Sequence, residues 1–162
     1  MEKRDVLPND VDPSGSTSEK SIAFIVMSWA LVIFWAGFIF FMSSNTGTGL
    51  NEDLGVASEV YRVMKDVQAQ LLGPGVDALS PLAHFFEYAV FGLLWTNALR
   101  CHVPLRRACL IAIICTGLYG ATDEFHQLFV PGRMCDPLDW IVDVLGGGLG
   151  VGIAYCFINK TK

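Results

Sequence analysis

Residues 22–42 form a run of 21 residues without a charged side chain, in which Ser28 is the one clearly polar residue. About 20 such residues, at about 1.5 Å rise each, cross the hydrocarbon core of a bilayer as a helix. The run is too long, and too rich in Trp and Phe, for the core of a signal peptide, and no small-residue cleavage motif follows it closely. We therefore predict a retained transmembrane helix, preceded by a disordered tail of residues 1–21 rich in Asp, Ser, Pro and Gly.

Three further apolar runs follow, at residues 82–99, 108–130 and 138–158. Each is long enough to span a bilayer, and each carries its ionisable residues at one end. The sequence thus predicts an all-α membrane protein, a four-transmembrane-helix bundle within residues 22–158, followed by a short tail of residues 159–162.

Composition agrees with a membrane protein and argues against other classes. Hydrophobic residues make up 52% of the chain and charged residues only 17%, whereas a soluble domain carries about a quarter charged residues. The net charge of -5 offers no basic face for a nucleic acid, so we expect no nucleic-acid partner. The five cysteines include no CxxC pair, which argues against both a disulfide framework and a thiolate zinc site.

The basic residues predict how the spans are oriented. Eight of them fall in the two tails and in the loop after the second run, and three fall on the other side. Cytoplasmic loops carry the excess of Lys and Arg. We therefore expect a multi-pass protein of the cytoplasmic membrane with both termini, including the tail of residues 1–21, in the cytoplasm.

The segment between the first and second spans contains a second kind of helix. Apolar residues recur at three- and four-residue spacing with charged residues between them, namely Val56, Val60, Met64, Val67 and Leu71. This pattern predicts an amphipathic helix closed by the Gly-Pro-Gly sequence at residues 73–75. We expect it to lie flat on the extracytoplasmic interface, either covering what lies beneath it or serving as a connector.

On this topology every Asp, Glu and His of the spans falls at the outer end of its helix, together with further polar residues. The residues are Ser43 and Ser44, then His84, Glu87 and Tyr88, then Asp123, Glu124, His126 and Gln127, and finally Asp139 and Asp143. A charge at the bilayer centre costs roughly 3 kcal/mol on insertion scales, so such groups face one another or water. The sequence predicts a polar pocket near the outer membrane face.

Some of these residues have structural interpretations as well. Ser80 and Asp136, each followed by Pro, fit helix N-caps, and Asp139 fits a capping acid. Asp143 lies too deep for capping, and its structural alternative is an ion pair with Arg133 or His84. The glycine-rich stretch at residues 146–152 predicts close helix packing.

The run at residues 119–127, continued by residues 129–133, resembles the signature of the VanZ-like membrane protein family. Asp139, Asp143, Gly146 and Gly150 extend the resemblance, as do residues 84–88 and the Ser43–Ser44 pair. Pro81 stands where a basic residue is frequent in the family, which argues against an anion site assisted by that residue. Asp143 stands where Asn is frequent, which makes the site more acidic. The family takes its name from a factor that gives low-level resistance to the lipoglycopeptide teicoplanin, so the resemblance implies a prokaryotic protein of the outer face of the cytoplasmic membrane.

Three functions are compatible with this pattern. The first is a non-catalytic envelope factor, of the antibiotic-resistance type, that binds an envelope lipid, lipid-linked glycan or lipoglycopeptide. The second is a membrane-embedded enzyme acting on a lipid-linked substrate by acid/base or metal-assisted chemistry. The third is a proton-coupled carrier, whose through-path would require several copies of the chain.

Each candidate residue follows from the chemistry of its side chain. Glu124, His126 and His84 are the acid/base candidates, and Asp123, Asp139 and Asp143 offer oxygen ligands for a divalent cation. The guanidinium of Arg133 suits a phosphate or carboxylate. The other ligand-binding candidates are Gln127, Glu87, Tyr88, Ser43 and Ser44. Membrane lipids are the expected partners, and an oligomer is compatible with the sequence.

Overall fold

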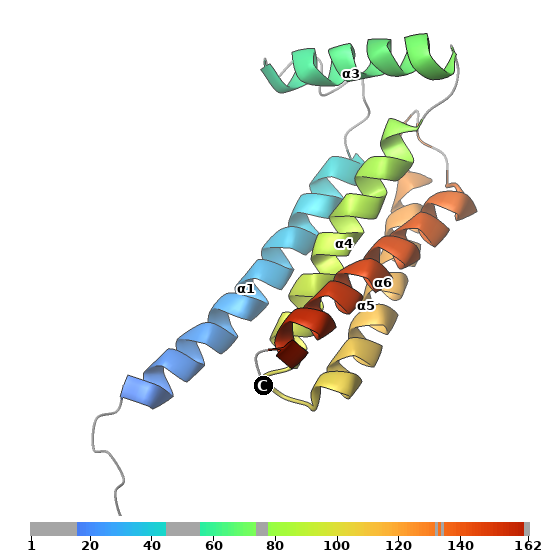
Figure 1. Ribbon diagram of the computed structural model, residues 1–162. Coiled ribbons are helices and arrows are strands. Elements are labelled where there is room, and N and C mark those ends of the chain that lie inside the picture. The colour runs from blue at the N-terminus through green and yellow to red at the C-terminus, as the bar shows by residue number, and fades with distance from the viewer. Residues whose placement is uncertain (1–15, 45–55, 74–77, 132, 134, 161–162) are drawn as a thin grey trace, which may run out of the picture.

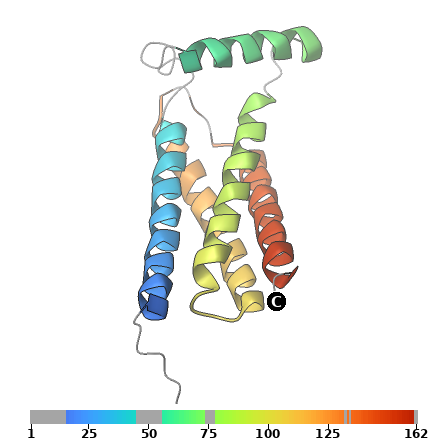
Figure 2. The ribbon, with the colours of Figure 1, turned by 60° about the vertical axis from the view of Figure 1, so that its left-hand side comes forward.

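The computed structural model describes residues 16–44, 56–73, 78–131, 133 and 135–160, and this part of the chain is entirely helical between its turns. Residues 1–15 of the predicted tail lie outside the described residues, and residues 16–21, predicted to be disordered, belong to the first helix. The helices are α1 (Ser16–Ser44), α3 (Val56–Leu72), α4 (Leu79–Leu99), α5 (Leu105–Gln127) and α6 (Pro137–Lys160). Helices α1, α4, α5 and α6 run side by side, and α3 lies across one end of them (Figures 1 and 2).

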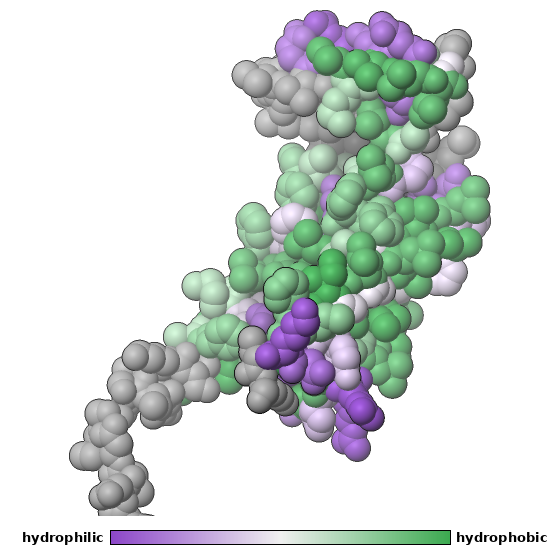
Figure 3. Space-filling view, viewed as in Figure 1, coloured by the Kyte–Doolittle hydropathy of each residue, from purple (hydrophilic) through white to green (hydrophobic). Residues whose placement is uncertain are grey.

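Three helices are long and apolar enough to cross a membrane, over Ile22–Ser44, Leu105–Gln127 and Pro137–Lys160. Large apolar side chains such as Phe34, Leu118 and Leu145 point outward from them, and apolar residues cover much of the bundle surface in Figure 3. Helix α4 is not among the three, because His84, Glu87 and Asn97 lower its mean hydropathy.

Helix α4 packs most extensively against α6, and glycines make this contact close. A Cβ atom on Gly146 or Gly150 would overlap the backbone carbonyl oxygen of Phe85 or Ala89 on α4, and one on Gly92 would overlap the carbonyl of Gly147. Small residues let helix backbones approach in this way. The packing role predicted for the glycine-rich stretch is confirmed.

Helix α1 is held to the bundle by polar contacts that cross between helices. The Trp35 indole N–H donates to the Glu87 carbonyl oxygen at 2.9 Å, and the Tyr119 hydroxyl donates to the Ala36 carbonyl oxygen at 2.7 Å. Two turns nearer the N-terminus of α1, the Asn97 amide donates to the Ser28 hydroxyl at 3.1 Å. These bonds satisfy half-buried donors that lipid would leave without a partner.

Helix ends agree with the sequence in one case and differ in another. The Asp136 carboxylate accepts the Leu138 backbone N–H at 2.9 Å, with Pro137 as the first helical residue, so the predicted cap is confirmed. The cap predicted at Ser80 is wrong, because α4 begins at Leu79, with Ala78 at the cap position, and Ser80 lies in its first turn. The side-chain oxygen of Gln68 on α3 accepts the backbone N–H groups of Ala78 and Leu79 instead, at 3.2 and 3.0 Å.

Helix α3 has the amphipathic pattern that its sequence predicts. Its exposed apolar side chains include Val63, Met64, Val67 and Leu71, while Arg62 pairs with Glu59. In Figure 3 hydrophilic residues gather along the side of α3 that faces away from the bundle, and apolar residues gather on the side toward the bundle. The helix ends at Gly73, whose positive φ of 95° is the usual left-handed helix stop.

Candidate functional site

The helix ends that carry the predicted polar residues lie together at the end of the bundle where α3 lies (Figure 1). The first turns of α4 and α6 meet the last turns of α1 and α5 there, because successive helices run in opposite directions. The polar cluster is defined here as Ser43, His84, Tyr88, Asp123, Glu124, Gln127, Asp139 and Asp143. All of these residues except the half-buried Asp139 are buried.

The centre of the polar cluster is a hydrogen-bonded pair between α4 and α6. The Nδ1 atom of His84 lies 3.1 Å from Oδ1 of Asp143, and the two residues are 6% and 0% exposed. Gly120 makes room for this pair, because a Cβ there would lie 3.1 Å from Oδ2 of Asp143. Of the two partners expected for Asp143, the structure therefore has His84.

Glu124 reaches the same region from α5. Its Oε2 atom accepts the backbone N–H of Asp136 at 2.9 Å, and its Oε1 atom accepts the Gln127 side-chain amide at 3.3 Å. Glu124 is only 4% exposed, and these two bonds hold its buried carboxylate in one orientation. Gln127, predicted to bind a ligand, thus also supports Glu124.

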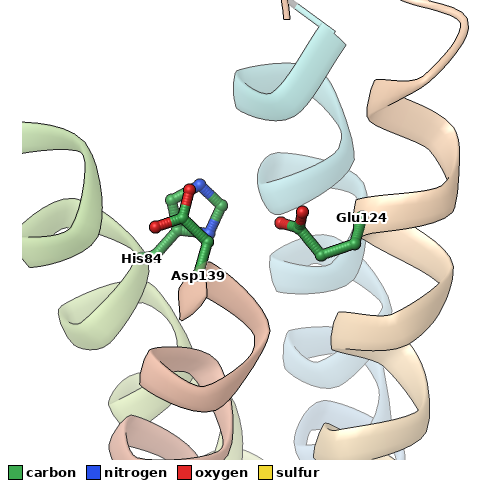
Figure 4. A group of neighbouring side chains, drawn as sticks. All are labelled: His84, Glu124 and Asp139. Carbon is green, nitrogen blue, oxygen red and sulfur yellow. The ribbon is translucent and has the colours of Figure 1, made fainter. Parts of the chain in front are cut away.

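Within the described part of the chain, His84, Glu124 and Asp139 bring three atoms that can ligate a metal ion close together. One donor atom from each residue lies within 4.8 Å of the other two. Figure 4 shows Asp139 of α6 beside the imidazole ring of His84, with the Glu124 carboxylate directed toward both from α5. Of the metal ligands expected from the sequence, only Asp139 belongs to this group. Asp143 is hydrogen-bonded to His84.

Several buried polar atoms of the polar cluster lack hydrogen-bond partners among the described residues. They are both carboxylate oxygens of Asp123, Oδ2 of Asp143, the Tyr88 hydroxyl and the Ser43 hydroxyl. Ser43 and Gln127 lie close to Asp123 but do not meet hydrogen-bond geometry. Each such group costs about 1–3 kcal/mol, and more when it is charged. Unsatisfied acceptors of this kind favour a bound donor.

The remaining candidates lie at the margin of the polar cluster. The Ser44 hydroxyl donates to the Phe40 carbonyl oxygen at 2.6 Å and lies 3.0 Å from Nε2 of His126, so His126 donates to Ser44. His126 therefore contacts α1 and is not part of the tight group formed by His84, Glu124 and Asp139. The half-buried Arg133 and Glu87 lie within electrostatic range of each other.

Sequence reasoning missed two parts of the site. One is the backbone N–H of Asp136, which orients Glu124; any residue except Pro could donate this bond, so the residue type does not predict it. The sequence predicts no separate role for Gly120 within the run at residues 119–127, although a small residue three positions before Asp123 on the same helix is a signal of close packing.

The apolar helices and the buried ionisable cluster define an α-helical membrane protein. A family model described as VanZ/LLP1 matches residues 28–158, and the chain belongs to that family. Among curated proteins and among solved structures, no match to the chain was found.

Proposed function

We propose that this chain is a four-span protein of the cytoplasmic membrane with its polar cluster at the extracytoplasmic face. Helix α4 packs against all three helices that are apolar enough to span, which supports its crossing with them. The excess of Lys and Arg in the tails and in the loop after α4 supports cytoplasmic termini. The apolar side of α3 suits a helix that rests on the outer interface.

We further propose that the polar cluster binds the headgroup of an amphiphile rich in hydrogen-bond donors, as in a lipid-linked glycan or a lipoglycopeptide. The observation that carries this proposal is the set of buried carboxylate oxygens without partners on Asp123 and Asp143. Sugar hydroxyls and amines are donors, and a bond to a charged acceptor contributes about 1.5–3 kcal/mol. An acidic cluster selects such groups over a bare phosphate.

The surroundings of the polar cluster suit the apolar part of the same ligand. Large apolar side chains at the end of α5, in the following turn and at the start of α6 are exposed, namely Phe125, Leu128, Phe129 and Leu138. An acyl chain in the outer leaflet would lie against them while its headgroup reaches the polar cluster. This combination favours an amphiphile over a small soluble ligand.

Substituting Asp123 with Asn should weaken headgroup binding by about 10- to 100-fold, the equivalent of losing one charged hydrogen bond. The measurement is retention of added lipid by native mass spectrometry of the full chain in nanodiscs. Separate arms would use a lipid-linked glycan, a lipoglycopeptide and an ordinary phospholipid. Asp66→Asn, on the exposed face of α3, is the matched control and should retain wild-type binding.

Two results would contradict this proposal. One is equal retention of the glycan-bearing lipids by the Asp123→Asn and Asp66→Asn proteins. The other is no preference of the wild-type chain for either glycan-bearing ligand over the phospholipid. A preference for one of the two glycan-bearing ligands would identify the source of the headgroup.

A membrane-embedded enzyme is the second candidate function, favoured by the proximity of His84 and Glu124. Their donor atoms lie within 4.8 Å, close enough for proton exchange through one water molecule. Appearance of a cleaved lipid-linked substrate in the same assay, and its loss in Glu124→Gln, would favour this function. A carrier is less well supported, because residues 22–44, 88–99, 108–122 and 144–159 contain no Asp, Glu, His, Lys or Arg to relay protons.

A further inference from the structure

We propose that His84, Glu124 and Asp139 bind one divalent transition-metal ion, of the Mn²⁺ or Zn²⁺ type. Ligand atoms about 2.1 Å from such an ion lie at most about 4.2 Å apart. The three donor atoms are already within 4.8 Å of one another, so small side-chain rotations complete the site. The three residues come from α4, α5 and α6, and the ion would join these helices.

Asp143 supplies the independent observation for this site. It contacts His84 at Nδ1, which leaves Nε2 as the ring nitrogen free to ligate, and it is fully buried with Oδ2 unpartnered. A carboxylate on the far nitrogen of a ligating histidine is the usual arrangement around protein metals, because it fixes the ring and raises its basicity. Asp143 is therefore a positioning residue for the ligand His84.

The Glu124 carboxylate is oriented in the same manner. The Asp136 backbone N–H and the Gln127 amide each bond one of its oxygens and leave each oxygen a further lone pair. Two carboxylates would neutralise a divalent ion in a buried place.

The donor set limits the kind of metal. One imidazole favours a transition metal over Ca²⁺ or Mg²⁺, and the absence of a thiol from the group argues against Cu(I). Three protein ligands leave at least one position for water or a ligand oxygen. This inference goes beyond headgroup binding, since it depends only on the positions of the donors.

The test is Mn²⁺ titration of the full chain in nanodiscs after chelator treatment, followed by electron paramagnetic resonance. We expect one tightly bound Mn²⁺ per chain, nitrogen coupling from one imidazole, and displacement by Zn²⁺. Glu124→Gln and Asp139→Asn should each weaken binding at least tenfold. Asp143→Asn should weaken it by about 10- to 100-fold, the effect typical of an outer-shell partner.

The matched controls are His102→Gln, in the turn between α4 and α5, and Asp66→Asn on α3, and both should bind Mn²⁺ as the wild type does. The metal site would be overturned if the wild type bound Mn²⁺ no more tightly than the folded Glu124→Gln and Asp139→Asn variants. A spectrum without nitrogen coupling would overturn it as well. Folding of each variant is checked by its thermal transition.

The outcomes also separate the metal site from headgroup binding. Selective retention of a glycan lipid by a chain that binds neither Mn²⁺ nor Zn²⁺ would overturn the metal site alone. Metal binding with these ligand dependences, in a chain without preference for glycan lipids, would support the metal site and contradict the headgroup proposal.

Discussion

Replacing Gly150 with Ala should lower the free energy of unfolding of the bundle by about 1–3 kcal/mol or more, the range for overpacked cores. The added Cβ would overlap the carbonyl oxygen of Ala89 and lie 2.7 Å from its carbonyl carbon and 3.0 Å from the Leu93 backbone nitrogen. These are backbone atoms, which cannot rotate away, so α4 and α6 must separate. Reversible unfolding in mixed detergent micelles measures the effect.

Gly152→Ala, on the same helix, is the matched control for Gly150→Ala. A Cβ at Gly152 meets nothing within 4 Å, so its stability should equal that of the wild type or exceed it slightly. Equal stability of the two variants would contradict the close approach of α4 and α6 at Gly150.

Replacing Asp143 with Ala should cost about 3 kcal/mol of stability, near the lower end of the range for breaking a buried pair. The substitution leaves Nδ1 of the buried His84 without its partner. Removing one carboxylate from an acidic cluster offsets part of the loss. Asp143→Asn keeps an acceptor oxygen toward His84 and should lose less than Asp143→Ala in the same unfolding assay.

A double-mutant cycle with His84→Ala isolates the pair. The double variant should be more stable than the sum of the two single losses predicts, because the second substitution removes a group that no longer has a partner. Asp66→Ala is the control for loss of an exposed carboxylate and should change stability little. Strictly additive losses for His84→Ala and Asp143→Ala would contradict the pairing.

The sequence predicts most of this architecture because membrane helices obey simple constraints of length and polarity. The apolar runs located α1, α5 and α6, and the position of polar residues at one end of each run predicted their meeting at one end of the bundle. The period of the amphipathic segment located α3. These features depend on residue type and spacing, which a sequence displays directly.

The pairings within the site depend on helix rotation, which apolar runs do not record. His84 and Glu124 were both candidates for acid/base chemistry, but their grouping with Asp139, and the bond between His84 and Asp143, follow from how α4, α5 and α6 turn toward one another. The position of His126 against α1 depends on the same rotation. The sequence does not predict that Gln68 caps α4, because the accepting oxygen is on α3 and the N–H groups that donate to it are at the start of α4.

Headgroup photo-crosslinking tests most directly whether the polar ends of α4, α5 and α6 form one headgroup site. A glycan lipid with a diazirine on its sugar would be irradiated with the full chain in nanodiscs, and the labelled peptides mapped by mass spectrometry. We predict labels near His84, Asp123 and Asp139, all competed by unmodified glycan lipid. Labels confined to α3, or to the opposite end of the bundle near His102, would contradict a headgroup site at the polar ends of the helices.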